Sequence, residues 1–147
     1  MNYDKIMSAY DERMAELLDE LSLFQDWTER YEYIISLGKK LPPLDERFRN
    51  DENLIKGCQS RVWVGSEMKD GRLLLHADSD SVITKGLIAL FIRLLSGLTP
   101  EEIVRADLGR LDESGLREHL APTRANALHS MTAQIKQAAL EAIGSGQ

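Results

Sequence analysis

Apolar residues that recur every three or four positions predict two helices at the start of the chain. In residues 6–21 these positions hold Ile, Met, Tyr and Leu, and charged residues lie between them. A second helix is predicted to begin after Asp26, whose side chain can cap it, and to end at Gly38, a candidate left-handed stop before two prolines. We expect these N-terminal helices, within residues 1–40, to pack on the body of the domain.

Strand-like runs follow in the middle of the chain. Two of them, at residues 61–68 and 72–78, flank an Asp-Gly pair, which is a strong short-range signal for a hairpin. Residues 53–56 are the candidate for a short third strand. The pattern therefore predicts a small antiparallel sheet of about three strands within residues 53–80, with one face that needs cover.

Helical periodicity returns over residues 81–142. The run at residues 82–95 is apolar nearly all round, which predicts a buried helix lying across the sheet. Gly86 inside this run costs about 1 kcal/mol relative to alanine, so we expect a close backbone contact there. Thr99 is followed by Pro and two Glu residues, a capping box that predicts the start of the next helix.

The last part of the chain completes an α+β fold. Short helices are predicted near residues 101–104 and 112–119, and a long one over about residues 123–142. Residues 143–147 are small and polar after the first and are expected to form a frayed tail. We expect residues 1–147 to form a single domain with helices, a small antiparallel sheet and then more helices.

The composition of the chain limits the classes of function that it can have. The chain has 147 residues, a formal charge of −6, 43% hydrophobic and 29% charged residues, as in ordinary soluble domains. The acidic balance argues against nucleic-acid binding, which needs a surplus of Lys and Arg. No run reaches the roughly 20 apolar residues of a membrane span, and no basic and apolar leader is seen, so a cytoplasmic location is expected.

The single cysteine, Cys58, is the main candidate for chemistry. One thiol excludes an internal disulfide and any multi-thiolate zinc or iron–sulfur site within one chain. A thiol with the ordinary pKa near 8.5 is only about 3% ionised at pH 7, and Lys56 and Arg61 are the nearby cations that could raise this fraction. A lone cysteine can equally be a small buried apolar residue, so both interpretations stay open at this point.

Several motifs, in order along the chain, resemble those of the SufE family of sulfur-acceptor proteins, which includes CsdE. The resemblance extends from about residue 41 to residue 136 and rests on NLIKGCQSRVW at 53–63, ADSDS at 77–81, TKGLIAL at 84–90, LTPEEI at 98–103 and LAPTRANAL at 120–128. It implies the SufE fold, which is similar to that of the scaffold protein IscU.

The resemblance implies a partner role in sulfur transfer. A cysteine desulfurase of the SufS or CsdA type, which carries its own pyridoxal phosphate, would hold sulfur as a persulfide. Cys58 would take that sulfur and pass it to an iron–sulfur scaffold of the SufBCD type, with no cofactor of its own. This is a covalent transfer partner rather than a free-standing enzyme, and a homodimer is one state that the sequence leaves open.

The resemblance also assigns supporting residues. Gly57, Gln59 and Ser60 would shape the loop around Cys58, although residues that form turns would look the same. Arg124 is similar to the family's C-terminal arginine, which lies near the cysteine loop and the desulfurase interface; a solvated arginine in a first helical turn is the alternative. Thr123 replaces a common serine and Ala127 a common glycine.

Other candidate groups have simpler explanations. Asp78, Asp80 and Ser81 look like part of a metal loop, but capping of the following helix explains them with fewer assumptions. Trp63 is expected in the core. No metal site is predicted, because the three histidines show no ligand spacing and are expected to be structural or at the surface.

Two alternatives to sulfur relay remain. A thiol enzyme that reduces peroxide would use Cys58 as a sulfenate, but the chain has no resolving cysteine. A protein that only binds and activates a partner enzyme would carry Cys58 as a structural residue. Replacing Cys58 by serine separates relay from activation by binding alone.

Overall fold

The computed structural model describes residues 8–56 and 60–145 of the chain. Its N-terminal part holds the helices α1 (Ala9–Ser22) and α2 (Trp27–Lys39) and the short 3-10 helix η2 (Glu46–Phe48). The elements that follow are β1 (Val62–Lys69), β2 (Arg72–Ser79), α3 (Val82–Leu95), α4 (Pro100–Arg105), the 3-10 helices η3 (Leu108–Ser114) and η4 (Arg117–His119), and α5 (Pro122–Gly144).

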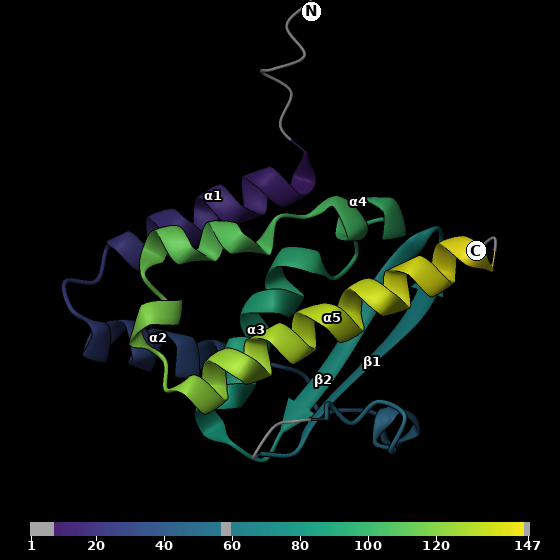
Figure 1. Cartoon of the computed structure of the whole chain (residues 1–147), viewed down its shortest axis with the longest axis horizontal. Helices are drawn as coiled ribbons and strands as arrows, with labels where there is room; N and C mark the ends of the chain where they lie inside the picture. Colours follow the sequence, from purple (N-terminus) through teal and green to yellow (C-terminus); the bar gives the residue numbers. More distant parts are fainter. Residues whose placement is uncertain (1–7, 57–59, 146–147) are drawn as a thin grey trace, which may run out of the picture.

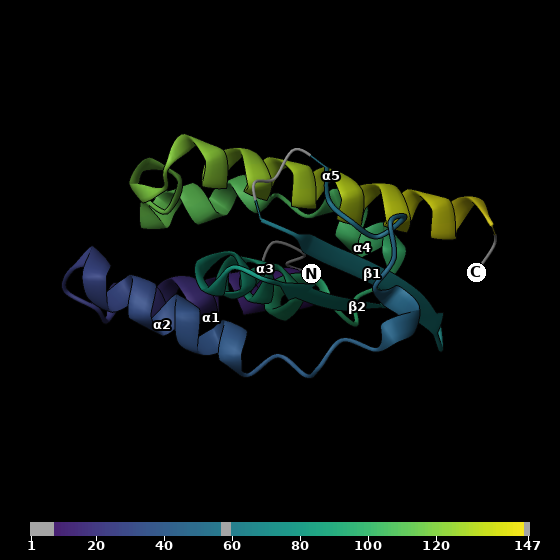
Figure 2. The same ribbon diagram turned by 90° about the horizontal axis from the view of Figure 1, so that it is seen from below.

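These elements form three layers. In Figure 1, α5 runs across α3 and the β1–β2 hairpin, and Figure 2 shows α5 and α2 on opposite sides of a middle level that contains α3 and the hairpin. α3 packs on both α2 and β2, whereas α5 packs on β1 and α4. The α+β class expected from the sequence is therefore confirmed, and α3 lies at the centre of the molecule.

The hairpin is a two-stranded antiparallel sheet. Its register runs from Val62 opposite Ser79 to Lys69 opposite Arg72. Asp70 and Gly71 make the turn with φ angles of 53° and 77°, the positive values that a tight two-residue hairpin turn requires. The Asp-Gly signal in the sequence therefore predicted this turn correctly.

The prediction of a third strand at residues 53–56 is wrong. This segment makes a single bridge, Leu54 opposite Trp63, instead of a ladder. A hydrogen-bonded turn precedes the bridge, where the amide of Asn53 donates to the carbonyl of Asn50, and the chain turns again at Lys56. The stretch between these two turns therefore forms only one bridged residue pair with β1.

The central helix α3 is buried as its apolar pattern predicted. Nine of its residues are buried, and seven of these are apolar: Leu87, Ile88, Ala89, Leu90, Phe91, Leu94 and Leu95. Each fully buried Leu, Ile or Phe side chain contributes about 1.5–3 kcal/mol relative to an exposed one. The inward face of the hairpin, with Val62, Val64, Leu73, Leu75 and Ala77, packs into the same core.

Two glycines allow α2 and α3 to pack closely. A Cβ atom at Gly86 would lie 2.5 Å from the carbonyl oxygen of Ile34, so the close contact predicted for Gly86 is confirmed. Gly38 was expected to end α2, but α2 continues to Lys39 and is followed by Lys40 in right-handed conformation. A Cβ atom at Gly38 would lie 2.7 Å from the nitrogen of Gly86, so glycine is needed there for packing, not for a stop.

Helix ends in the C-terminal half follow local signals with two exceptions. The capping box at Thr99 is present. The helix expected near residues 112–119 is instead two 3-10 segments, separated where Gly115 takes a φ of 79°. α5 extends to Gly144, two residues beyond its expected end, so Ile143 is helical rather than part of a frayed tail.

Candidate functional site

The segment that leads to Cys58 is fixed against β1 on its N-terminal side. The amide of Ile55 donates to the carbonyl of Val62 at 2.7 Å, and the amide of Val64 donates to the carbonyl of Asn53 at 2.9 Å. From α5, the side-chain amide of Gln134 donates to the carbonyls of Asn53 and Val64 at 3.2 and 3.3 Å. Three parts of the chain therefore meet just before Cys58.

The C-terminal side is fixed by a second set of hydrogen bonds. The amide of Arg61 donates to Oδ1 of Asp80 at 3.0 Å, and the amide of Asp80 donates to the carbonyl of Arg61 at 3.2 Å. Because Ile55 contacts Val62 directly, the chain enters and leaves residues 56–61, the Cys58 segment, at one place. That place is the open end of the hairpin, where β1 begins and β2 ends.

The residues predicted for the site divide into two groups. Gly57, Cys58 and Gln59 lie outside the described residues. Ser60 is half-buried two residues before β1, and Arg124 is exposed in the first turn of α5, where its amide donates to the carbonyl of Ala121. Among the residues that the structure describes, no hydrogen bond or ion pair joins Ser60 to Arg124.

Both cationic residues that lie near Cys58 in the sequence are described by the structure. Lys56 and Arg61, the two end residues of the Cys58 segment, are both exposed. A cation close to sulfur favours the ionised form of a thiol, and this influence on Cys58 stays a prediction because Cys58 lies outside the described residues.

The acidic residues expected to cap α3 have other partners. Ser81 alone caps α3, since its hydroxyl accepts from the amide of Thr84 at 3.4 Å. Asp80 binds the backbone of Arg61, as described above. Asp78 pairs with Arg49 at 2.8 Å and with Lys85 at 3.2 Å. Capping was therefore the wrong explanation for both aspartates, and each has an arginine partner from a distant part of the chain.

Asp78 is the centre of an ion-pair network beside the Cys58 segment. Burial alone would raise the pKa of the Asp78 carboxyl, but hydrogen bonds from Arg49, the amide of Ser79 and Lys85 outweigh it and lower that pKa. Trp63, expected in the core, is half-buried on the outer face of the sheet, where its ring lies 4.7 Å from the guanidinium carbon of Arg49. Sequence reasoning missed Arg49 because nothing in its neighbouring residues marks it.

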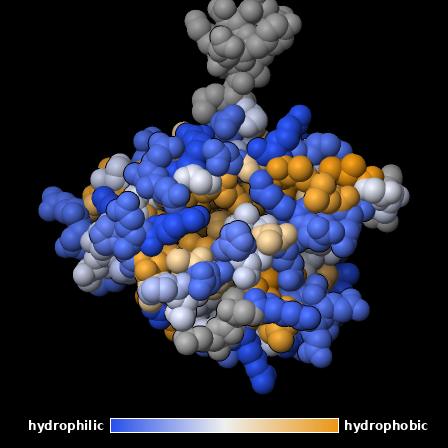
Figure 3. All heavy atoms as spheres, viewed as in Figure 1, coloured by the Kyte–Doolittle hydropathy of each residue, from blue (hydrophilic) through white to orange (hydrophobic). Residues whose placement is uncertain are grey.

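An open groove of about 700 Å³ borders the same region. It lies between the segment before Cys58, β1 and the C-terminal half of α5, and Asp51, Glu52, Lys56, Ile135 and Glu141 are among its lining residues. Figure 3 shows apolar side chains gathered over the C-terminal part of α5, where Leu140 and Ile143 are exposed.

Two of the three histidines have structural environments, whereas His129 is exposed on α5. His76 contacts Glu67 at 2.9 Å and stacks on Phe48, and His119 stacks on Trp27. Within residues 8–56 and 60–145 there is no group of three or more His, Cys, Asp or Glu side chains that could hold a metal ion.

No helix in the described part of the chain has the length and apolar character needed to cross a bilayer.

Comparison with known proteins agrees with this architecture. Residues 15–139 match the family model described as "SufE: Fe-S metabolism associated domain". The chain is 38% identical over 131 residues to an uncharacterised SufE-like protein of Rhizobium meliloti, a match that covers 86% of this chain and 94% of that protein.

A solved structure supports the fold. The solution structure of a hypothetical protein from Thermus thermophilus superposes with a TM-score of 0.77, covering 90% of this chain and 96% of that one at 18% identity. At this identity the likeness concerns the fold alone. Together with the family model and the Rhizobium relative, it leads to one conclusion. The chain belongs to the SufE family, whose domain is associated with iron–sulfur metabolism.

Proposed function

We propose that this protein accepts sulfur from a cysteine desulfurase of the SufS or CsdA type and carries it on Cys58 to an iron–sulfur scaffold. The observation that carries the proposal is that this member of the SufE family has one cysteine. The chain before and after this cysteine, at Ile55 and Arg61, is anchored by hydrogen bonds at the open end of the hairpin. A carrier needs its thiol at a defined site that a partner enzyme can approach.

The chemistry is a sulfur analogue of thiol–disulfide exchange. The Cys58 thiolate attacks the terminal sulfur of the desulfurase persulfide, the S–S bond of that persulfide breaks, and the desulfurase cysteine leaves as a thiolate. Cys58 then carries the persulfide, with no change in the number of electrons and no external oxidant. The reaction uses no cofactor bound by this chain, since pyridoxal phosphate acts earlier, in the desulfurase.

The neighbouring residues have supporting roles in this proposal. Lys56 and Arg61, exposed at the two ends of the Cys58 segment, raise the thiolate fraction through their positive charge. Gly57, Gln59 and Ser60 shape the segment. Arg124, exposed at the start of α5, contributes to docking of the desulfurase.

Steady-state desulfurase assays test the proposal. With a SufS-type desulfurase, free cysteine and a reductant, the wild-type chain should stimulate sulfide release several-fold, and Cys58→Ser should abolish the stimulation because serine cannot accept sulfur. Ser22→Ala, at the exposed end of α1, is the matched control and should behave as the wild type.

Retained stimulation by Cys58→Ser would contradict relay. It would instead favour a protein that activates its partner by binding alone. A binding measurement with the same variant completes the comparison, because relay predicts that Cys58→Ser still binds the desulfurase.

A further inference from the structure

Arg49 joins three elements at the open end of the hairpin. It follows η2 directly, its Nη2 donates to Oδ2 of Asp78 on β2 at 2.8 Å, and its guanidinium lies over Trp63 on β1. Lys85 of α3 contacts the other oxygen of Asp78 at 3.2 Å, which adds a fourth element. The side chains of Arg49 and Asp78 are 29% and 21% exposed, so water screens this ion pair less than one at the open surface.

The position of this contact relates it to Cys58. Trp63 and Asp78 face each other in the register, and the next pair, Val62 and Ser79, is the last of the sheet. Arg49 therefore links the two strands at the residue pair next to the last one, close to where the chain enters and leaves the Cys58 segment. Trp63 also forms an isolated β-bridge with Leu54, which lies two residues before that segment.

A guanidinium suits this role better than an ammonium group. It is planar, so it can lie on the indole face while its edge donates to the carboxylate. One side chain thereby contacts both strands at the open end of the hairpin and is linked through Asp78 to Lys85 at the start of α3.

We propose that Arg49 is a positioning residue for sulfur transfer, which holds both anchors of the Cys58 segment in the geometry that the desulfurase persulfide requires. This inference rests on the proposed relay function. Arg49 acts through the frame around Cys58, so its loss should slow transfer of sulfur without weakening the docking of the partner.

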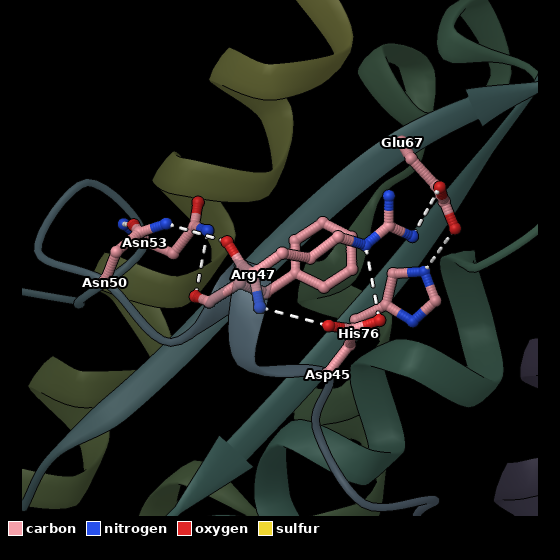
Figure 4. Close-up of polar contacts among 7 residues, drawn as sticks. Asp45, Arg47, Asn50, Asn53, Glu67 and His76 are labelled. Carbon is pink, nitrogen blue, oxygen red and sulfur yellow. Dashed lines mark hydrogen bonds and ion pairs between the residues drawn. The ribbon is translucent and has the colours of Figure 1, made fainter.

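Arg47, two residues earlier on η2, provides a matched control. It also pairs with a carboxylate, Glu67 at 2.9 Å, and its guanidinium lies 4.4 Å from the centre of an aromatic ring, that of Phe48. Figure 4 shows Arg47, Glu67 and His76 over the middle of the hairpin, away from its open end. Arg47→Met therefore removes the same charge and a similar set of contacts without touching the frame of the Cys58 segment.

The test measures the rate of persulfide formation on Cys58 by rapid quench and intact mass, over a range of concentrations of SufS-type desulfurase. For Arg49→Met we expect the maximal rate to fall by at least roughly fivefold, since small displacements of reacting groups cost large factors in rate. The half-saturating concentration should stay within about twofold of wild type. Arg47→Met should transfer at the wild-type rate, and Arg49→Lys should recover part of the loss.

A double-mutant cycle assigns the effect to the contact itself. Asp78→Asn alone should slow transfer, and its combination with Arg49→Met should slow it by less than the product of the two single effects, because the two variants share the contact between Arg49 and Asp78. If Arg49→Met does not fold, as judged by thermal melting, the comparison of Arg49→Lys with Asp78→Asn takes its place, and both should lower the maximal rate.

Two results would overturn the inference. One is a maximal rate for Arg49→Met that equals that of Arg47→Met; the other is a loss that appears only in the half-saturating concentration. Failure of the proposed function looks different, because the wild-type chain itself would then acquire no sulfur.

Discussion

At the scale of single residues, Glu20 connects three helices. Its carboxylate on α1 accepts two hydrogen bonds of 2.6 Å from Arg93 on α3 and another from the hydroxyl of Tyr33 on α2. The hydrogen bonds from Arg93, partly opposed by burial, lower the pKa of Glu20 from 4.5 to about 2. The ionised form is therefore favoured by the folded state.

The pH dependence of this contribution has a defined sign. A carboxyl whose pKa is lower in the folded state stabilises the protein above its unfolded pKa and loses that effect as the pH falls toward the folded pKa. Glu20→Gln should therefore lower the free energy of unfolding at pH 7, by at most about 1 kcal/mol because the pair is partly exposed. Urea unfolding should show this difference shrinking from about pH 4.5 toward pH 2.

Glu16→Gln is the control for this prediction. Glu16 is exposed on the same helix, so its replacement should change stability by less than about 0.5 kcal/mol. A difference between wild type and Glu20→Gln that stays constant from pH 7 to low pH would count against the assigned role of Glu20.

At the scale of elements, the crossing of α2 and α3 depends on glycine. A methyl group at Gly86 would meet the backbone of Ile34, which cannot rotate away as a side chain can. Gly86→Ala should therefore destabilise the fold by about 1–3 kcal/mol, the usual cost of overpacking, in spite of alanine's better helix propensity. Chemical denaturation measures this loss.

Gly144→Ala supplies the opposite case. A Cβ atom at Gly144, the last residue of α5, meets nothing within 4 Å, so this variant should be as stable as wild type or slightly more stable. Equal stability of Gly86→Ala and Gly144→Ala would show that the two helices can move apart at little cost.

Elements governed by local signals were predictable from the sequence. The hairpin turn at Asp70 and the buried helix α3 rest on residues that lie next to one another in the chain. Gly38 carries the same local signal as a helix stop, yet its role depends on Gly86 in another helix. Pattern alone cannot distinguish a glycine that ends a helix from one that lets a second helix approach.

The sequence motif of the candidate site could be recognised from the sequence, but the contacts of the residues around it could not. The segment around Cys58 stands out in the sequence, but Asp78 and Asp80 look like caps because they precede a helix. Their partners, Arg49 and Arg61, are 29 and 19 residues away in the chain. Such contacts are set by the register of the hairpin and by how η2 lies on it, which local patterns do not specify.

At the scale of the whole molecule, both anchors of the Cys58 segment lie at the open end of the hairpin, beside a packed body. Buried residues of α3, the hairpin and α5 form the core, and the Cys58 segment is attached to it at the open end of the hairpin by hydrogen bonds on both sides. A partner enzyme can then approach one end of the domain without disturbing the core. This arrangement suits the proposed relay, in which the protein would carry sulfur between two larger partners.

The central claim, that Cys58 is the covalent carrier, is tested most directly by intact mass spectrometry. The protein is mixed with a SufS-type desulfurase and free cysteine without reductant, and its mass is recorded over time. The account predicts a gain of about one sulfur atom that is absent in Cys58→Ser, because the sulfur is held as a persulfide on that thiol. No gain in the presence of a demonstrably active desulfurase, or an equal gain in Cys58→Ser, would contradict it.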